Sequence, residues 1–143
     1  MRQDLIVTQS VIINASLDQV WNGMTQPSMI KKYLYGTDTL TDWKPGSTIV
    51  FQGEYEGIKY RDHGIILENT PHRKIRYSYW SGFSGLEDKP ENYSEVMYEL
   101  NPLSNNETEL IWTQKGYADE SRYAHSKSGM TDFLELVKST IES

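Results

Sequence analysis

Residues 128–138 read Ser-Gly-Met-Thr-Asp-Phe-Leu-Glu-Leu-Val-Lys, and this stretch decides the fold. Its apolar residues recur at steps of three and four, which is the period of one helix face. The opposite face carries polar side chains. A helix this regular needs an apolar surface to cover, and the rest of the chain must provide it. The stripe consists of Met130, Phe133, Leu134, Val137 and Ile141.

The surface beneath this helix is predicted to be a sheet, because beyond residue 38 the apolar period changes to two. In the segment 48–55, Ile49, Phe51 and Tyr55 alternate with residues of the other face. Gly57 supplies the positive φ that a turn into the next strand requires. Strict alternation of this kind is typical of half-buried antiparallel strands. Comparable segments follow at 59–68, 75–79, 96–100 and 110–116.

The N-terminal third is predicted to contain one strand and two short helices. Residues 5–14 are rich in Val and Ile and indicate the first strand. Ser16 and Gln19 have the spacing of a capping box at a helix start. Pro27 fits the first turn of a second short helix that ends near residue 33 or 34. The fold class is therefore α+β: a curved antiparallel sheet of about six or seven strands wrapped around a long C-terminal helix.

The composition indicates one ordinary globular unit. The chain has 143 residues, of which 37% are hydrophobic and 24% are charged, so the composition does not indicate disorder. No repeat or linker divides it, and residues 1–143 are predicted to form one domain. Because the chain has no cysteine, disulfides and thiolate metal sites are also excluded.

Charge and hydropathy limit the classes of partner that the protein is expected to bind. The net charge is −6 and the 14 basic residues are scattered, which disfavours nucleic acid as a partner. No apolar run approaches 18 residues, so we expect no membrane insertion. The N-terminus lacks the apolar region of a secretion signal, so a cytoplasmic location is expected.

At this point the chain resembles the activator-of-heat-shock-protein-90-ATPase-like family, within the START-like, helix-grip (SRPBCC) superfamily. The resemblance is carried by the order and spacing of motifs along essentially the whole chain. They are Val11-Ile12-Ile13-Asn14-Ala15-Ser16 with Gln19-Val20-Trp21 and Met24-Thr25, then Trp43-Lys44-Pro45-Gly46-Ser47, Gly64-Ile65-Ile66-Leu67-Glu68, Pro71, and the stretch from Ser128 to Lys138.

The resemblance implies a Bet v-like, helix-grip fold with a cavity between the sheet and the C-terminal helix. Family members usually have Trp after the glycine of the final helix, whereas this chain has Met130. Met is flexible and fills irregular gaps, so this departure would reshape the pocket floor. The superfamily includes carriers, receptors and cyclases, so the fold implies no particular reaction.

The candidate ligand-binding residues are the inward side chains of the strands and of the final helix. The aromatic ones either fill the core or line a cavity, and both readings stay open. What favours a cavity is the number of hydroxyl and indole N–H groups that would need partners in an interior. The set comprises Phe51, Ile66, Tyr77, Tyr79, Tyr98, Trp112, Gln114, Met130, Phe133 and Leu134.

Three polar residues have two readings each. Gln114 shares a face with Trp112, where it would either orient a ligand carbonyl or make a structural hydrogen bond. Asp62 and Glu68 lie on the face of Gly64 and Ile66, so one of them would point inward with a raised pKa, or both would lie in water at strand ends.

The remaining aromatic and loop features are also ambiguous. Trp43 and Trp80 either gate the cavity mouth or pack under loops, whereas Trp21 is assigned to the core. The glycine- and charge-rich segment 82–93 is either a lid or a flexible hairpin end.

The sequence predicts neither a metal site nor nucleophilic catalysis, and an enzyme is less favoured than a binding protein. His63, His72 and His125 have no metal-ligand spacing, and no nucleotide-binding or nucleophile-elbow glycine motif occurs. We therefore expect no metal, no cofactor and no catalytic residue.

Three functions follow as alternatives. The first is binding of a small hydrophobic molecule or lipid in the cavity. The second, which the resemblance alone implies, is interaction with a chaperone of the heat-shock-protein-90 class, with a role in stress response. The third is an enzyme that uses a buried carboxylate or tyrosine on a pocketed substrate. A monomer and a homodimer are both compatible with the sequence.

Overall fold

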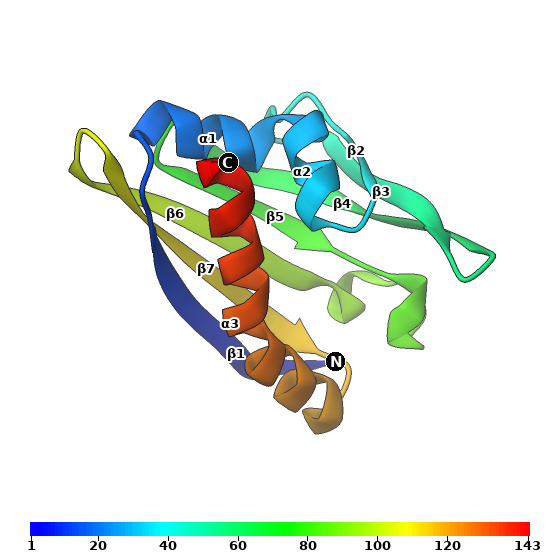
Figure 1. Cartoon of the computed structure of the whole chain (residues 1–143). Helices are drawn as coiled ribbons and strands as arrows, with labels where there is room; N and C mark the ends of the chain where they lie inside the picture. Colours follow the sequence, from blue (N-terminus) through cyan, green and yellow to red (C-terminus); the bar gives the residue numbers. More distant parts are fainter.

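A computed structural model describes all 143 residues. Seven antiparallel strands form one sheet in the order β1-β7-β6-β5-β4-β3-β2 (Figure 1). This confirms the predicted α+β helix-grip class. The elements are β1 (Arg2–Ile13), α1 (Leu17–Thr25), α2 (Pro27–Tyr33), β2 (Asp38–Leu40), β3 (Thr48–Tyr55), β4 (Ile58–Thr70), β5 (Lys74–Tyr79), the 3-10 turns η1 (Gly82–Ser84) and η2 (Pro90–Asn92), β6 (Ser94–Ser104), β7 (Glu107–Tyr117) and α3 (Glu120–Glu142).

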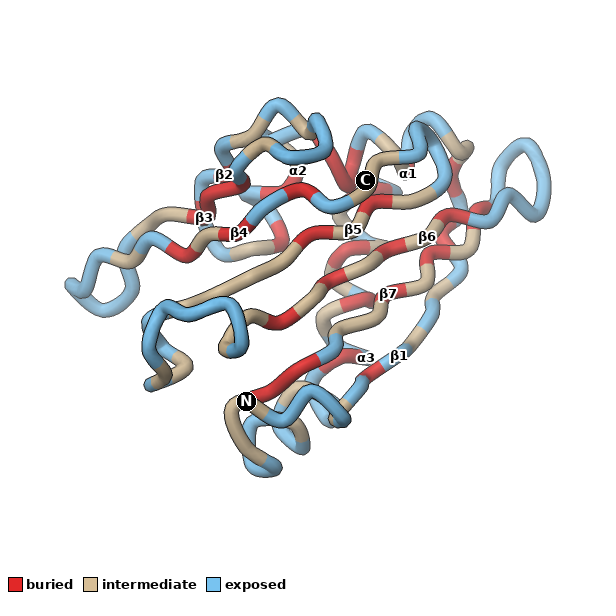
Figure 2. Tube along the Cα trace, turned by 180° about the vertical axis from the view of Figure 1, so that it is seen from behind, coloured by how far each residue is buried: buried red, intermediate tan, exposed pale blue.

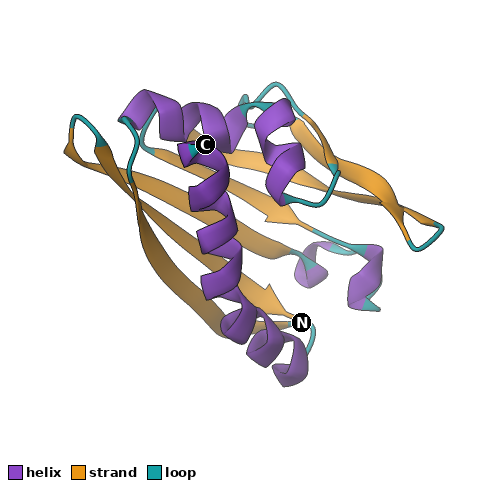
Figure 3. Cartoon of the chain, viewed as in Figure 1, coloured by secondary structure: helices purple, strands orange, loops and turns teal.

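All three helices lie on the same face of the sheet (Figure 3). The long helix α3 crosses this face, and its buried residues are Met130, Leu134, Val137 and Ile141. These belong to the predicted stripe, while Phe133 is only partly buried. The helix begins well before that stripe, at Glu120, because Asp119 caps it by accepting a hydrogen bond from the Arg122 amide at 2.8 Å.

The two short helices close one end of the sheet. The capping box of α1 is present: the Ser16 Oγ accepts from the Gln19 amide at 3.2 Å, and the Gln19 Oε1 accepts from the Ser16 amide at 2.9 Å. Pro27 occupies the first turn of α2, as expected. The Tyr33 hydroxyl of α2 donates to the Gly23 carbonyl of α1 at 2.9 Å, which fixes one helix against the other.

The strands alternate between the concave face beneath the helices and the opposite, convex face. The alternation is visible as buried and exposed segments along β4 and as buried and intermediate segments along β5 and the first part of β6, and the β3–β4 and β6–β7 turns are exposed (Figure 2). The short strand β2 was not predicted, since three residues are too few for a period to show. A bulge in β4 between Ile66 and Glu68 shifts the register against β5.

That bulge corrects one sequence-based interpretation. An extra residue in one strand turns the following side chains to the other face. Glu68 therefore lies outside, where its Oε1 is 3.3 Å from the Arg76 Nε, while Asp62, on the other side of the bulge, stays inside. Glu68 is not an interior carboxylate.

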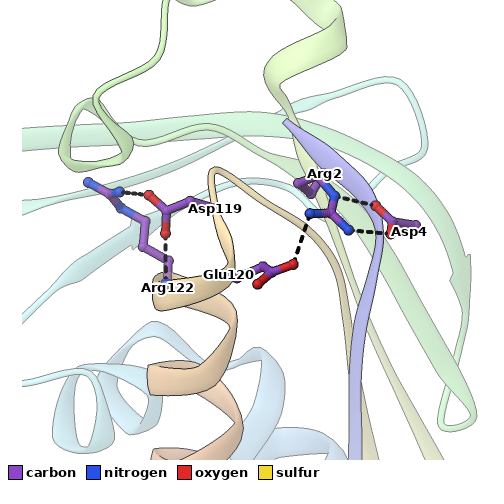
Figure 4. A network of polar contacts seen from close by, with 5 residues as sticks. All are labelled: Arg2, Asp4, Asp119, Glu120 and Arg122. Carbon is purple, nitrogen blue, oxygen red and sulfur yellow. Dashed lines mark hydrogen bonds and ion pairs between the residues drawn. The ribbon is translucent and has the colours of Figure 1, made fainter.

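The helix α3 is attached to β1 at both ends. Near its start, Arg2 pairs with Asp4 and with Glu120 at 2.8 and 3.2 Å, next to the Asp119–Arg122 cap (Figure 4). Near its end, the Lys138 ammonium donates to the Ile12 carbonyl at 2.7 Å. Because α3 follows the β1 edge, it leaves part of the sheet uncovered toward β3 and β4.

The packed core lies beneath α1, α2 and the second half of α3. Its fully buried side chains are mostly aliphatic, among them Val20, Met24, Ile75, Leu110 and Val137. None of the helices is both long and apolar enough to cross a membrane.

Candidate functional site

A cavity of about 640 Å³ lies between the sheet, the end of α2 and the middle of α3. Twelve of its nineteen lining residues are hydrophobic. Its size is within the usual range of small-molecule sites, about 300–1,000 Å³. The lining comprises Leu34, Tyr35, Thr37, Phe51, Glu54, Tyr55, Tyr60, Asp62, Tyr77, Tyr79, Phe83, Val96, Trp112, Gln114, His125, Ser126, Gly129, Met130 and Phe133.

Aromatic rings form the inner wall of this cavity. Phe51 on β3 contacts both tyrosines of β5, with centroid distances of 5.7 Å to Tyr77 and 5.8 Å to Tyr79. Trp112 on β7 meets Phe133 of α3 edge-on at 5.2 Å. Edge-to-face and tilted pairs at such distances are favourable and hold the rings in place.

A buried carboxylate interrupts this aromatic wall. Asp62 is only 7% exposed, and its Oδ2 accepts a hydrogen bond from the Tyr79 hydroxyl at 2.6 Å. Burial, reinforced by the nearby negative charge of Asp62, raises the pKa of Tyr79 well above its usual value. Tyr79 therefore remains a neutral donor at physiological pH.

Glycine makes this part of the wall possible. Gly64 lies on β4 between Asp62 and Ile66, and a side chain there would overlap the Ser78 carbonyl of β5. Only glycine allows the two strands to approach so closely while Tyr79 reaches Asp62. At Gly53 a Cβ would lie 2.6 Å from the Tyr60 hydroxyl, so a larger residue there would displace the end of that ring.

The mouth is bordered by the β3–β4 hairpin and by the segment after β5. The Tyr60 hydroxyl and the Thr37 Oγ1 share a hydrogen bond of 2.5 Å, and the Phe83 ring lies 5.9 Å from the Tyr60 ring. These contacts join the start of β2, the hairpin and η1 at one rim.

The segment 82–93 is anchored on the convex face, outside the cavity. The Asp88 Oδ2 lies 3.1 Å from the His63 Nε2, and the Tyr93 hydroxyl donates to the Asp88 Oδ1 at 2.5 Å. Burial and Asp88 together raise the pKa of Tyr93 to about 12. The sequence suggested either a lid or a flexible hairpin end for this segment. In the structure the segment contains two 3-10 turns, and Phe83 in the first of them lines the cavity.

Trp112 carries a buried donor without a partner. The residue is 9% exposed, and its Nε1–H finds no acceptor in the protein. Trp112 borders both the main cavity and a void of about 20 Å³ behind it. An unpaired buried N–H is costly, so such groups call for an explanation such as a bound ligand or water.

Seven of the ten candidate residues line the cavity: Phe51, Tyr77, Tyr79, Trp112, Gln114, Met130 and Phe133. The other three do not. Ile66 and Leu134 are packed in the core, and the Tyr98 hydroxyl instead donates to the Met24 carbonyl of α1 at 3.2 Å. Alternation selects a face of a strand, but not how far along that face the covering helices extend.

The structure also shows the surroundings of the tryptophans. Neither Trp43 nor Trp80 lines the cavity. The Trp43 Nε1–H donates to the Thr25 carbonyl at the end of α1 at 3.1 Å, and Trp43 packs against the core. The Trp80 Nε1–H donates to the Leu86 carbonyl at 3.3 Å, so Trp80 packs under the loop after β5. Trp21 is only partly buried and stacks on His72 with a centroid distance of 5.5 Å. Its assignment to the core is therefore only partly right.

The sequence reading missed most of the rim. Thr37, Tyr60, Phe83, His125 and Ser126 come from loops, strand ends and the first half of α3. Of these five, only Tyr60 could have been predicted from the sequence, because strand alternation places it on the same face of β4 as Asp62. No group of three or more His, Asp or Glu side chains is arranged to hold a metal ion.

Comparison with known proteins identifies the family. The model of the family described as Activator of Hsp90 ATPase homolog 1-like protein matches residues 14–142. A comparison with curated proteins finds no match. The solution structure of ChR145 from Cytophaga hutchinsonii is 36% identical, with a TM-score of 0.83 over 99% of this chain and 97% of that one.

Two more distant structures share the fold. CV1439 from Chromobacterium violaceum is 21% identical, with a TM-score of 0.77 over 98% of this chain and 99% of that one. The Aha1 dimer from Colwellia psychrerythraea is 18% identical, with a TM-score of 0.73 over 96% of each chain. With its sequence matching the family model over nearly its whole length, this chain belongs to the Activator of Hsp90 ATPase homolog 1-like family.

Proposed function

We propose that the protein binds a small, mostly apolar molecule in the cavity between the sheet and α3. The observation that carries this proposal is the cavity itself: about 640 Å³ walled by aromatic rings in a chain of only 143 residues. The cavity is open to water, and exposed apolar side chains such as Tyr55 and Phe83 border it. A ligand in the cavity would remove this apolar surface from water, which is favourable.

The polar groups of the wall support a ligand with a few directed contacts. The Trp112 Nε1–H lacks an acceptor, and Gln114 lies beside it on the same face of β7. A mostly apolar pocket with a small number of such groups is the usual design of a small-molecule site. The ligand would thus be held by ring contacts and oriented by one or two hydrogen bonds.

Native mass spectrometry of freshly purified protein, followed by a thermal-shift screen of lipids and aromatic metabolites, tests the proposal. A ligand at a hundred times its Kd should stabilise the protein by about 2.7 kcal/mol. A bound species or a clear shift supports the cavity as a binding site. An apo mass together with no shift across the screen would contradict it.

A matched pair of variants makes this test specific to the cavity. Gly129 borders the cavity, and a Cβ there would meet no atom within 4 Å, so Gly129→Phe should occupy the space without a backbone clash. Ser128→Phe places the same ring on the neighbouring exposed position, which does not line the cavity. We expect binding to be lost in the first variant and kept in the second.

A second candidate is association with an ATPase of the Hsp90 class, which family membership over residues 14–142 favours. Its test is stimulation of such an ATPase by the purified protein. Stimulation that persists in Gly129→Phe would assign this role to the outer surface. The Colwellia relative is a dimer, so the oligomeric state should be measured by light scattering in the same preparation.

A further inference from the structure

We propose that the ligand of this cavity carries a cationic nitrogen, and that Asp62 binds it. This inference rests on the proposed function and narrows it to one chemical class, hydrophobic amines. Its basis is a buried carboxylate with no cationic partner at the wall of an aromatic cavity.

The charges that line the cavity have one sign. Its ionisable acids are Glu54 and Asp62, and neither a lysine nor an arginine lines it. The one basic residue is His125, on an exposed turn of α3. A fatty acid or another anion would therefore meet negative charge and no permanent positive group. A cation would meet a complementary field, and low-dielectric walls strengthen that field.

Asp62 has unused binding capacity. Its Oδ2 accepts from the Tyr79 hydroxyl at 2.6 Å, but no hydrogen bond reaches Oδ1. Asp62 takes part in none of the ion pairs of the molecule. Oδ1 is not one of the fully buried side-chain atoms that lack a partner, and Asp62 lines the cavity, so this oxygen is open to a ligand there. An ammonium group in the cavity could donate to it and form a charge-assisted hydrogen bond.

The rings next to Asp62 also suit a cation. Phe51 is directly opposite Asp62 in the β3–β4 register, and Tyr79 contacts both Phe51 and the carboxylate. Aromatic faces attract ammonium groups, and the attraction grows when the pair is removed from water. The apolar part of the amine would extend along Tyr77 and Trp112 toward α3.

The alternative role for Asp62 is purely structural, as an acceptor that orients Tyr79. In that case a neutral Asn would serve equally well, because its carbonyl oxygen also accepts a hydrogen bond. The two roles differ in one measurable property, which is whether binding discriminates by ligand charge.

Three fluorescent probes of nearly equal size provide the test: 1-pyrenemethylamine, 1-pyrenemethanol and 1-pyrenecarboxylic acid. Each is titrated at pH 7 by fluorescence anisotropy against the wild type, Asp62→Asn and Asp132→Asn. The last variant makes the same change at an exposed position of α3 outside the cavity. We expect the wild type to bind the amine at least about tenfold more tightly than the alcohol, which corresponds to about 1.4 kcal/mol, and the acid most weakly.

In Asp62→Asn the affinity for the amine should fall to that of the alcohol, while the alcohol is unaffected and Asp132→Asn behaves as wild type. If the alcohol binds as well as the amine, or if Asp62→Asn keeps the preference, the amine proposal is overturned while cavity binding stands. If none of the three probes binds, the proposed function fails and this inference fails with it. Should Asp62→Asn not fold, the wild-type ranking of the three probes decides alone.

Discussion

The two ends of the concave sheet face have the same alternation but different interiors. At one end, α1, α2 and the second half of α3 cover aliphatic side chains such as Ile75 and Leu110, which are fully buried. At the other end lie Tyr79, Asp62 and Gln114, and the covering part of α3, residues 120–129, has no fully buried residue. The first end is a packed core and the second is a cavity.

The difference teaches that the covering elements, and not the strands, decide where the interior is filled. Apart from the bulge in β4, the central strands place a side chain inward at every second residue at both ends. The helices cover only part of this face, because α3 runs along β1 and the short helices α1 and α2 lie at one end of the sheet (Figure 1). Where coverage stops, the inward positions carry residues with polar tips, which tolerate contact with water or a ligand.

The largest expected effect is alkaline unfolding, which tests whether the cavity end is as dry as the core end. Burial raises the pKa of Tyr33 and Tyr98 at the core end and of Tyr77 and Tyr79 at the cavity end. A raised folded-state pKa means that stability is complete below pH 10, the ordinary tyrosine value, and is lost as the pH rises above it. Tyrosine absorbance at 295 nm and circular dichroism should therefore show tyrosinate formation together with unfolding.

Two variants assign this loss to the two ends. Tyr98→Phe and Tyr79→Phe should each move the alkaline midpoint to higher pH, since each removes one buried group that titrates on unfolding. If Tyr79→Phe leaves the midpoint unchanged while Tyr98→Phe shifts it, the cavity end is hydrated and the two ends differ in solvation as well as in packing.

Leu134→Ala tests the packed end directly. Leu134 is 2% exposed and does not border the cavity, so its truncation should lower the free energy of unfolding by about 2–5 kcal/mol. Urea unfolding measures the loss, with the exposed neighbour Glu135→Ala as the control. A loss below about 1 kcal/mol would mean that the space beneath the second half of α3 is already loose.

Trp112→Ala tests the boundary between the two ends. In a packed core this substitution costs about 3–5 kcal/mol. Because Trp112 already borders open space and its indole N–H has no partner, we expect a loss of less than about 3 kcal/mol together with weaker ligand binding. A large loss with unchanged binding would place Trp112 with the core and separate it from the site.

Phe83→Ala, at the outer limit of the cavity, should have the smallest effect. Phe83 is 53% exposed, so its removal should change the free energy of unfolding by no more than about 0.5 kcal/mol. If η1 restricts the mouth, the dissociation rate of a bound probe should rise in this variant, as stopped-flow fluorescence would measure. An unchanged rate would mean that ligands enter elsewhere.

Much of the fold was readable from periodicity and from a few short signals. The stripe from Met130 to Ile141 predicted the long helix, and the Ser16–Gln19 spacing predicted the cap of α1. These features depend on neighbours three or four residues apart, which a sequence displays directly. The start of α3 and the strand β2 were less clear, because neither has an apolar pattern of its own.

The candidate site was readable only in part. Alternation correctly chose the faces that carry Phe51, Tyr79 and Trp112, but it also placed Tyr98 at the cavity. Glu68 and Asp62 look equivalent along the strand, yet the bulge after Ile66 separates them onto opposite faces. The bulge depends on the pairing of β4 with β5, so the sequence of β4 alone does not indicate it.

The sequence by itself determined the class of fold, the order of its elements and the long amphipathic helix, because hydrophobic periods and caps are local properties. Only the tertiary structure decided that Asp62 lies buried against Tyr79 without a cation, and that the space beside it stays open. The reason is geometric. An interior is filled or left empty according to where elements distant in sequence cross, and that crossing depends on contacts made only after the chain has folded.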